Sequence, residues 1–95
     1  MSNNSQLANK QIAIRLKQYI TNEFLYDQEG FVLTNDFQLI EQGVVDSMGI
    51  FRLITFMEEA FDITVDPGDV LLSNFESVET ITALVNEKVT AQAVV

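Results

Sequence analysis

Apolar residues recur at helical spacing in three separate segments of the chain, and no segment shows the strict alternation of apolar and polar residues that is typical of a strand. The first segment runs from Gln6 to Leu25. Tyr19 lies beside its stripe of apolar residues, which occupy every fourth position: Ile12, Leu16, Ile20 and Phe24. An α-helix has about 3.6 residues per turn, so these side chains share one face. The spacing predicts an amphipathic helix.

The second and third segments carry stripes of their own, at spacings of three and four. In the second, from about Ser47 to Phe61, the stripe is Ile50, Leu53, Ile54, Met57 and Phe61. In the third it is Val78, Ile81, Leu84, Val85 and Val89. Ser77 is a favourable N-cap for this last helix, and we expect the tail after Thr90 to fray.

Two connections separate the predicted helices. The first, Asp27 to Val45, has no helical spacing, and we expect scattered apolar anchors to pin it to the core: Phe31, Val32, Phe37, Leu39 and Ile40. The second, Asp62 to Phe75, contains the only proline of the chain, and we expect one short helical turn around Asp69 to Leu72. The sequence therefore predicts an all-α fold, a small bundle of three main helices plus one short helix.

Size and composition limit the function. The 95 residues suit a single domain, 1–95, with its core between about 7 and 90 and flexible termini. A formal charge of −9 disfavours nucleic acid as a partner and favours basic protein surfaces. The chain has no histidine and no cysteine, which removes the most common general base, metal ligand and thiol nucleophile. We expect a cytoplasmic protein that is not an enzyme and has no membrane span.

The start of the second helix is the candidate site. Asp46 and Ser47 are both favoured at helix starts, so they can be read simply as a capped N-terminus. However, a long anchored loop delivers the chain to Ser47, and helical projection places Met48 and Phe51 away from the core stripe. This favours a serine presented to a partner. Its own chain offers no histidine or nearby lysine to activate it, so a base must come from another protein.

The sequence resembles the acyl carrier and peptidyl carrier proteins. The family's Asp-Ser-Leu motif, preceded by a glycine and an apolar pair, is similar to Gly43-Val44-Val45-Asp46-Ser47-Met48. The resemblance covers residues from about 36 to 85, including these further positions: Ile50, Leu53, Ile54, Glu58, Glu59, Phe61, Asp62, Ile63, Asp69, Asn74, Phe75, Ser77 and Val78. It implies that Ser47, flanked by Asp46, bears 4′-phosphopantetheine derived from coenzyme A, and that a thioester cargo travels on this arm.

Departures from the family pattern point to a subclass. Carriers of fatty acid synthesis usually have acidic residues just after the serine and one turn later, where this chain has Gly49 and Arg52. Met48 replaces the usual leucine, a volume-conserving change. The chain looks more like stand-alone carriers loaded by adenylating enzymes, such as D-alanyl and other aminoacyl or peptidyl carriers. The function expected is thus a stand-alone acyl or aminoacyl carrier of the secondary-metabolite or aminoacyl type.

The resemblance also implies partners: a phosphopantetheinyl transferase, an adenylating or acyl-loading enzyme, and a downstream synthase or transferase. The expected docking residues lie on the outer face of the second helix: Met48, Phe51, Arg52, Thr55, Glu58, Glu59 and Asp62. We expect the carrier itself to be monomeric. An alternative function is an unmodified acidic adaptor that binds a partner through this same helix.

Each charged residue also has a simpler interpretation. Glu58, Glu59 and Asp62 can be read as an ordinary solvated face, and Arg52 as the ion-pair partner of Glu59 or of another acid on its face. Asp62, Asp66 and Asp69 have a spacing that suggests a divalent cation, but they lack the Asp-x-Asp-x-Asp-Gly order of a calcium loop. We therefore predict no metal site.

Overall fold

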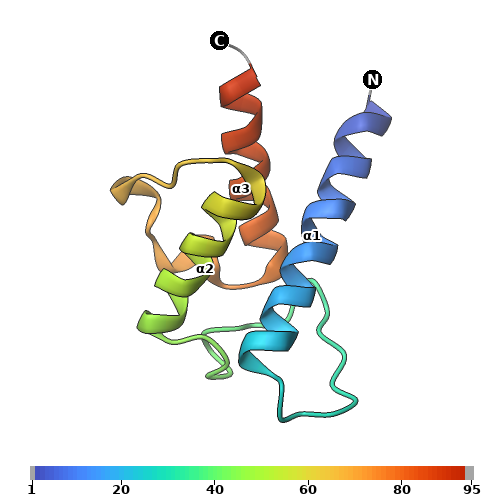
Figure 1. Ribbon diagram of the computed structural model, residues 1–95, viewed down its shortest axis with the longest axis vertical. Coiled ribbons are helices and arrows are strands. Elements are labelled where there is room, and N and C mark those ends of the chain that lie inside the picture. Colours follow the sequence, from blue (N-terminus) through green and yellow to red (C-terminus); the bar gives the residue numbers. More distant parts are fainter. Residues whose placement is uncertain (1, 94–95) are drawn as a thin grey trace.

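The computed structural model describes residues 2–93, and describes side chains from residue 8 to residue 91. Within this range the chain forms three α-helices, α1 (Ser2–Phe24), α2 (Ser47–Phe61) and α3 (Val78–Ala93). Two short 3₁₀ turns, η1 (Pro67–Asp69) and η2 (Leu72–Phe75), lie between α2 and α3, and residues 2–93 contain no strand. The all-α prediction is confirmed. Helix α1 runs opposite to α2 and α3, and α2 begins in the half of the molecule that also holds the α1–α2 loop (Figure 1).

The predicted bounds need three adjustments. Helix α1 begins at Ser2 instead of Gln6, and α3 continues past Thr90 to Ala93, while residues 94–95 lie outside the described range. The structure has two separate 3₁₀ turns, η1 and η2, where the sequence predicts a single short helical turn around Asp69 to Leu72. Pro67 fixes the backbone at the start of η1, and the Asp69 side chain accepts a hydrogen bond from the Asp66 N–H at 3.0 Å. The described residues therefore form a bundle of three α-helices, with 3₁₀ turns in place of a fourth helix.

The core lies where the apolar stripes of the three α-helices meet. Its fully buried helical residues are Leu16, Ile20, Leu53, Met57, Val78, Ile81 and Val85. At the margin Phe24, Ile54 and Phe61 are half-buried. Val89 was expected on the inner stripe, but it is 39% exposed. The last turns of α3 extend beyond the end of α2, so less of the bundle is available to cover them (Figure 1).

The long connection between α1 and α2 is anchored as predicted. Leu39 is fully buried, and Phe31 and Phe37 pack edge to face with ring centroids 5.3 Å apart. Val32 is not an anchor, because it is 80% exposed and its neighbour Leu33 is buried instead. The helices of the described residues include none that is both long and apolar enough to cross a membrane.

Candidate functional site

Asp46 caps the N-terminus of α2. Its backbone is extended (φ −104°, ψ −170°), and its side chain Oδ1 accepts a hydrogen bond from the Gly49 N–H at 2.8 Å. Its carbonyl oxygen accepts the Ile50 N–H at 2.9 Å. Asp46 is therefore the N-cap, and Ser47 is the first residue of the helix proper.

Ser47 is exposed, and its hydroxyl makes no hydrogen bond to the described part of the chain. The hydroxyl is therefore free to react, because Asp46 does the capping that a serine at a helix start often does. The amides of the first turn and the helix dipole make this position favourable for a negative charge. A phosphodiester on Ser47 would lie at the positive end of α2.

The residues before Ser47 are held by the loop that delivers them. The amides of Val44 and Val45 both donate to the Leu39 carbonyl oxygen, at 2.9 and 3.0 Å. The Val45 side chain is 1% exposed, and Gly43 adopts a positive φ of 77°, which favours glycine. These contacts fix the direction from which the chain enters α2.

Two large apolar side chains beside the serine face solvent, as the helical projection predicted. Met48 is 71% exposed and Phe51 is 60% exposed. A second exposed apolar run, Val70, Leu71 and Leu72, was not predicted from the sequence. Three consecutive apolar residues directly after the Pro67-Gly68-Asp69 turn could have indicated it. Exposed large apolar residues of this kind are typical of protein docking surfaces.

Arg52 pairs with Glu23 of helix α1, and not with Glu59 or another acid of α2 as the simpler interpretation had it. Its guanidinium donates to the Glu23 carboxylate at 2.5 Å and lies over the Phe24 ring, 4.6 Å from the centroid. Its backbone carbonyl oxygen accepts the Tyr19 hydroxyl at 3.3 Å. The positive charge at this position is thus balanced from α1.

Phe24 also explains the glycine after Met48. A Cβ at Gly49 would lie 2.9 Å from a Phe24 ring carbon and 3.1 Å from a Val45 methyl. The acidic side chain that fatty acid synthesis carriers usually have here would meet the same atoms. In this chain, Gly49 allows α1 to pack closely against the first turn of α2.

The remaining predicted docking residues have different surroundings. Thr55 is exposed and donates to the Phe51 carbonyl oxygen of its own helix at 3.1 Å. Glu58 is half-buried and accepts the Val65 N–H at 2.9 Å, while Glu59 is exposed. Asp62 ends α2 in the left-handed conformation, with φ 54°. Of these residues, Glu58 has a structural contact, because its side chain holds the segment that follows α2 through the hydrogen bond from Val65.

Two of the three aspartates considered for a cation, Asp66 and Asp69, contact Lys88 of α3. Lys88 forms ion pairs with Asp66, at 3.0 Å, and with Asp69. The hydrogen bond from Lys88 lowers the pKa of the Asp69 carboxyl, and it raises the pKa of the Lys88 ammonium in turn. Among the described residues, no three carboxylate, histidine or cysteine groups are positioned to hold a metal ion.

No protein-family model matches the chain. It is similar to the D-alanyl carrier protein of Lactococcus lactis subsp. cremoris strain MG1363, with 38% identity over 53 residues, which is 56% of this chain and 67% of the relative. The D-alanyl carrier proteins of strain SK11 and of Lactococcus lactis subsp. lactis strain IL1403 match with the same identity and coverage. This similarity agrees with the all-α bundle. The chain therefore belongs to the acyl carrier protein family of phosphopantetheine-binding carriers.

Proposed function

We propose that this protein is a stand-alone carrier that bears 4′-phosphopantetheine on Ser47 and shuttles an aminoacyl or acyl thioester between biosynthetic enzymes. The observation that supports this best is the free, exposed hydroxyl of Ser47 at the first residue of α2, next to a cap that Asp46 supplies. The chain is the substrate and the shuttle in this function, and its partners supply the catalysis.

Attachment of the arm needs a base and a metal that a transferase provides. The Ser47 oxygen attacks the phosphorus of coenzyme A that bears the pantetheine, and a phosphodiester forms while adenosine 3′,5′-bisphosphate leaves. The hydroxyl proton passes to a base of the transferase. Within this chain, Asp46 orients the first turn, and the helix dipole of α2 stabilises the new negative charge.

An aminoacyl cargo loaded by an adenylating enzyme is the preferred subclass. The relatives named above are D-alanyl carrier proteins. In addition, Gly49 and the Arg52–Glu23 pair replace the acidic positions that fatty acid synthesis carriers usually present, so the start of α2 offers Met48 and Phe51 with little net charge. A partner that fits this surface has an apolar docking site for Met48 and Phe51. Its basic residues would contact exposed acidic residues farther along α2, such as Glu59.

Intact-mass measurement tests the arm and its site. The full chain is incubated with coenzyme A, magnesium and a broad-specificity phosphopantetheinyl transferase, and then with a cognate-type transferase if the first is inactive. We expect the mass of one phosphopantetheine to be added to the wild type and none to Ser47→Ala. Ser73→Ala is the matched control, since Ser73 is also an exposed serine, and it should be modified fully. An unmodified wild type with both transferases would contradict the proposal.

The docking role of α2 is tested with the phosphopantetheine-bearing form before any cargo is attached. Met48→Ala and Phe51→Ala should each lower the kcat/KM for loading by an adenylating enzyme by about tenfold, as expected for a central apolar contact. Val32→Ala removes an apolar side chain that is 80% exposed on the α1–α2 loop, and it should load normally. Two results together would replace the carrier function with the adaptor function. They are that no transferase modifies the protein, and that Met48→Ala weakens its complex with another protein.

A further inference from the structure

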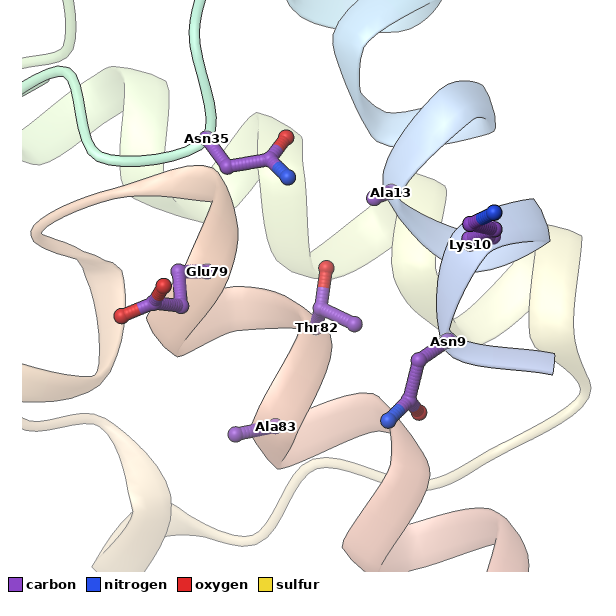
Figure 2. Close-up of a pocket in the computed structure, with 7 residues that line it drawn as sticks. All are labelled: Asn9, Lys10, Ala13, Asn35, Glu79, Thr82 and Ala83. Carbon is purple, nitrogen blue, oxygen red and sulfur yellow. The ribbon is translucent and has the colours of Figure 1, made fainter. Parts of the chain in front are cut away.

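Helix α1 has different neighbours along its length. Its first half lies opposite α3 across a pocket of about 310 Å³, whose lining includes Asn9 of α1 and Thr82 of α3 (Figure 2). No residue of α2 lines this pocket. The last turns of α1, residues 19–24, contact α2 through hydrogen bonds, an ion pair and ring contacts. This end of α1 therefore lies beside the helix that carries Ser47.

One ion pair joins this end of α1 to the outer face of α2. Glu23 is the only acidic residue in the sequence of α1, and Arg52 is the only basic residue in the sequence of α2. The Arg52 guanidinium donates to the Glu23 carboxylate at 2.5 Å and lies over the Phe24 ring, 4.6 Å from its centroid. The charge of Arg52 is thus cancelled by a residue that lies outside α2 and outside the Asp46-Ser47 motif.

Arg52 lies in the middle of the exposed face of α2. Residues three and four apart on a helix are neighbours, so Arg52 follows Met48 on this face, and Thr55 and Glu59 continue the same row. All four side chains are exposed. A rise of about 1.5 Å per residue places Arg52 roughly 7.5 Å along the helix axis from Ser47. The Debye length at physiological ionic strength is about 8 Å, so an uncancelled charge at Arg52 would act on a partner seated over the serine.

The other charges of the molecule favour a partner with a basic surface. The chain has a formal charge of −9, and Glu59 is an exposed acid in the same row as Arg52. The molecule as a whole therefore attracts positive groups. An unpaired Arg52 would oppose them at the docking face, because like charges that face each other across an interface weaken binding. Glu23 removes this conflict and leaves Met48 and Phe51 as uncharged, exposed contacts.

We propose that Glu23 is a specificity-determining residue: by neutralising Arg52, it allows the start of α2 to accept a partner whose apolar docking site is lined by basic residues. This inference rests on the proposed function of Ser47 as the phosphopantetheine site. The partner considered is the transferase that modifies Ser47, since it must seat on the start of α2. Glu23 acts through Arg52, so its effect falls on the KM for the carrier and not on kcat.

Steady-state kinetics of modification test the role of Glu23. The full chain is the substrate of a broad-specificity phosphopantetheinyl transferase, with coenzyme A and magnesium. Glu23→Gln keeps the side-chain shape and uncovers the charge of Arg52. We expect it to raise the KM for the carrier about three- to tenfold at roughly 20 mM salt, with kcat unchanged, and to match the wild type at roughly 500 mM salt.

Glu87→Gln is the matched control. Glu87 is an exposed acid in the later turns of α3, and its loss changes the net charge of the chain by the same amount. Its KM should stay within about twofold of the wild type at low salt, because the change lies away from the start of α2. The comparison separates the local charge at Arg52 from the overall charge of the protein.

A double variant separates charge cancellation from a structural role of the pair. Glu23→Gln combined with Arg52→Met removes both charges, and it should return the low-salt KM to within about twofold of the wild type. A structural role predicts the opposite, since the double variant keeps fewer contacts than Glu23→Gln alone. Circular dichroism verifies that each variant is folded.

Three results would overturn the proposal. They are a KM of Glu23→Gln equal to that of Glu87→Gln at low salt, a difference between the two that persists at high salt, and a folded double variant no better than Glu23→Gln. Each of these is measured on a chain whose wild type is modified on Ser47. A wild type that no transferase modifies would instead contradict the proposed function, and would remove the basis of this inference with it.

Discussion

The two helices α2 and α3 both begin near a serine, and the structure uses the two serines in opposite ways. At the start of α3, Ser77 is the N-cap, is 4% exposed, and its Oγ accepts the Thr80 N–H at 3.3 Å. Thr80 Oγ1 accepts the Ser77 N–H in return, at 3.1 Å. At the start of α2, Asp46 is the cap, and Ser47 lies one position later with its hydroxyl in solvent.

The difference teaches that a one-residue change in position decides whether the hydroxyl of a serine caps the helix or stays exposed. A serine at the N-cap has its oxygen engaged by the amide of the third helical residue. A serine after an aspartate cap keeps its oxygen free. The third positions differ as well, because Thr80 closes a reciprocal pair with its cap while Gly49 leaves space for the Phe24 ring.

Leu39 connects the two helix starts, and its loss should have the largest effect on stability. Its amide donates to the Glu76 carbonyl oxygen before α3 at 2.7 Å, its carbonyl oxygen holds the residues before α2, and its side chain is fully buried. We expect Leu39→Ala to lower the free energy of unfolding by about 2–5 kcal/mol. Urea denaturation measures this, with Val32→Ala as an exposed control. A loss below about 1 kcal/mol would show that the two starts are held independently.

Gly49→Ala should have the next largest effect, because it acts at the start of α2 and not at the start of α3. The new methyl group would press on the Phe24 ring at 2.9 Å, and overpacking of this kind costs about 1–3 kcal/mol. Gly68→Ala is the matched control, since a Cβ there has nothing within 4 Å. Thermal denaturation of both variants compares them. Equal stability of the two would mean that Phe24 moves aside, and that close packing of α1 does not require this glycine.

Removal of either helix cap should lower the free energy of unfolding by less than Leu39→Ala or Gly49→Ala does. Removal of the Ser47 hydroxyl should have almost no effect on stability. Asp46→Ala and Ser77→Ala should each lower the free energy of unfolding by about 0.5–2 kcal/mol, whereas Ser47→Ala should stay within about 0.5 kcal/mol of the wild type. Circular dichroism during urea denaturation checks all three. A Ser47→Ala loss as large as that of Asp46→Ala would contradict the assignment of Asp46 as the cap.

The sequence predicted what depends on local spacing and left out what depends on distant contacts. Helix α2 has the predicted bounds, Ser47 to Phe61, because its apolar stripe and its aspartate cap are both local signals. The exposure of Met48 and Phe51 follows from the same period. By contrast, the partner of Arg52 is Glu23, 29 positions away, and no pattern within α2 indicates it.

The same limit explains the errors in the connections. Val32 and Leu33 are adjacent apolar residues, and only the packing of the loop against the helices decides which one is buried. The pocket at Asn9 and Thr82 also arises from two helices far apart in the sequence, and in the sequence Thr82 is an ordinary helical threonine. The residues of the candidate site could be named from local sequence patterns. The contacts around them could be found only from the fold.

The segment between α2 and α3 is tied to α3 by charge, and this contact provides the smallest expected effect. Lys88 of α3 pairs with Asp66 and with Asp69 at the two ends of η1. Helix α3 thus has an ion pair in its later turns, at Lys88, in addition to the neutral Ser77–Thr80 cap at its start. Because the carboxylates are partly exposed, solvent weakens the pairs, and we expect a modest contribution to stability.

The dependence of stability on pH distinguishes this ion pair from the neutral cap. The hydrogen bond from Lys88 lowers the pKa of Asp69 in the folded state, so this stabilisation is present above the unfolded pKa near 3.8 and is lost as the pH falls through the lower folded value. The raised pKa of Lys88 gives stabilisation below 10.5 that is lost as the pH rises through the higher folded value. Lys88→Met should therefore lower the thermal unfolding midpoint at neutral pH and flatten its decline at both extremes of pH.

Lys10→Met is the control. It removes an exposed lysine without a salt bridge among the described residues, and it should leave the pH profile of the unfolding midpoint unchanged apart from the effect of net charge. If Lys88→Met kept the wild-type profile, the segment after α2 would be held by its apolar contacts and by Asn74, whose side chain donates to the Asp69 carbonyl oxygen at 2.8 Å.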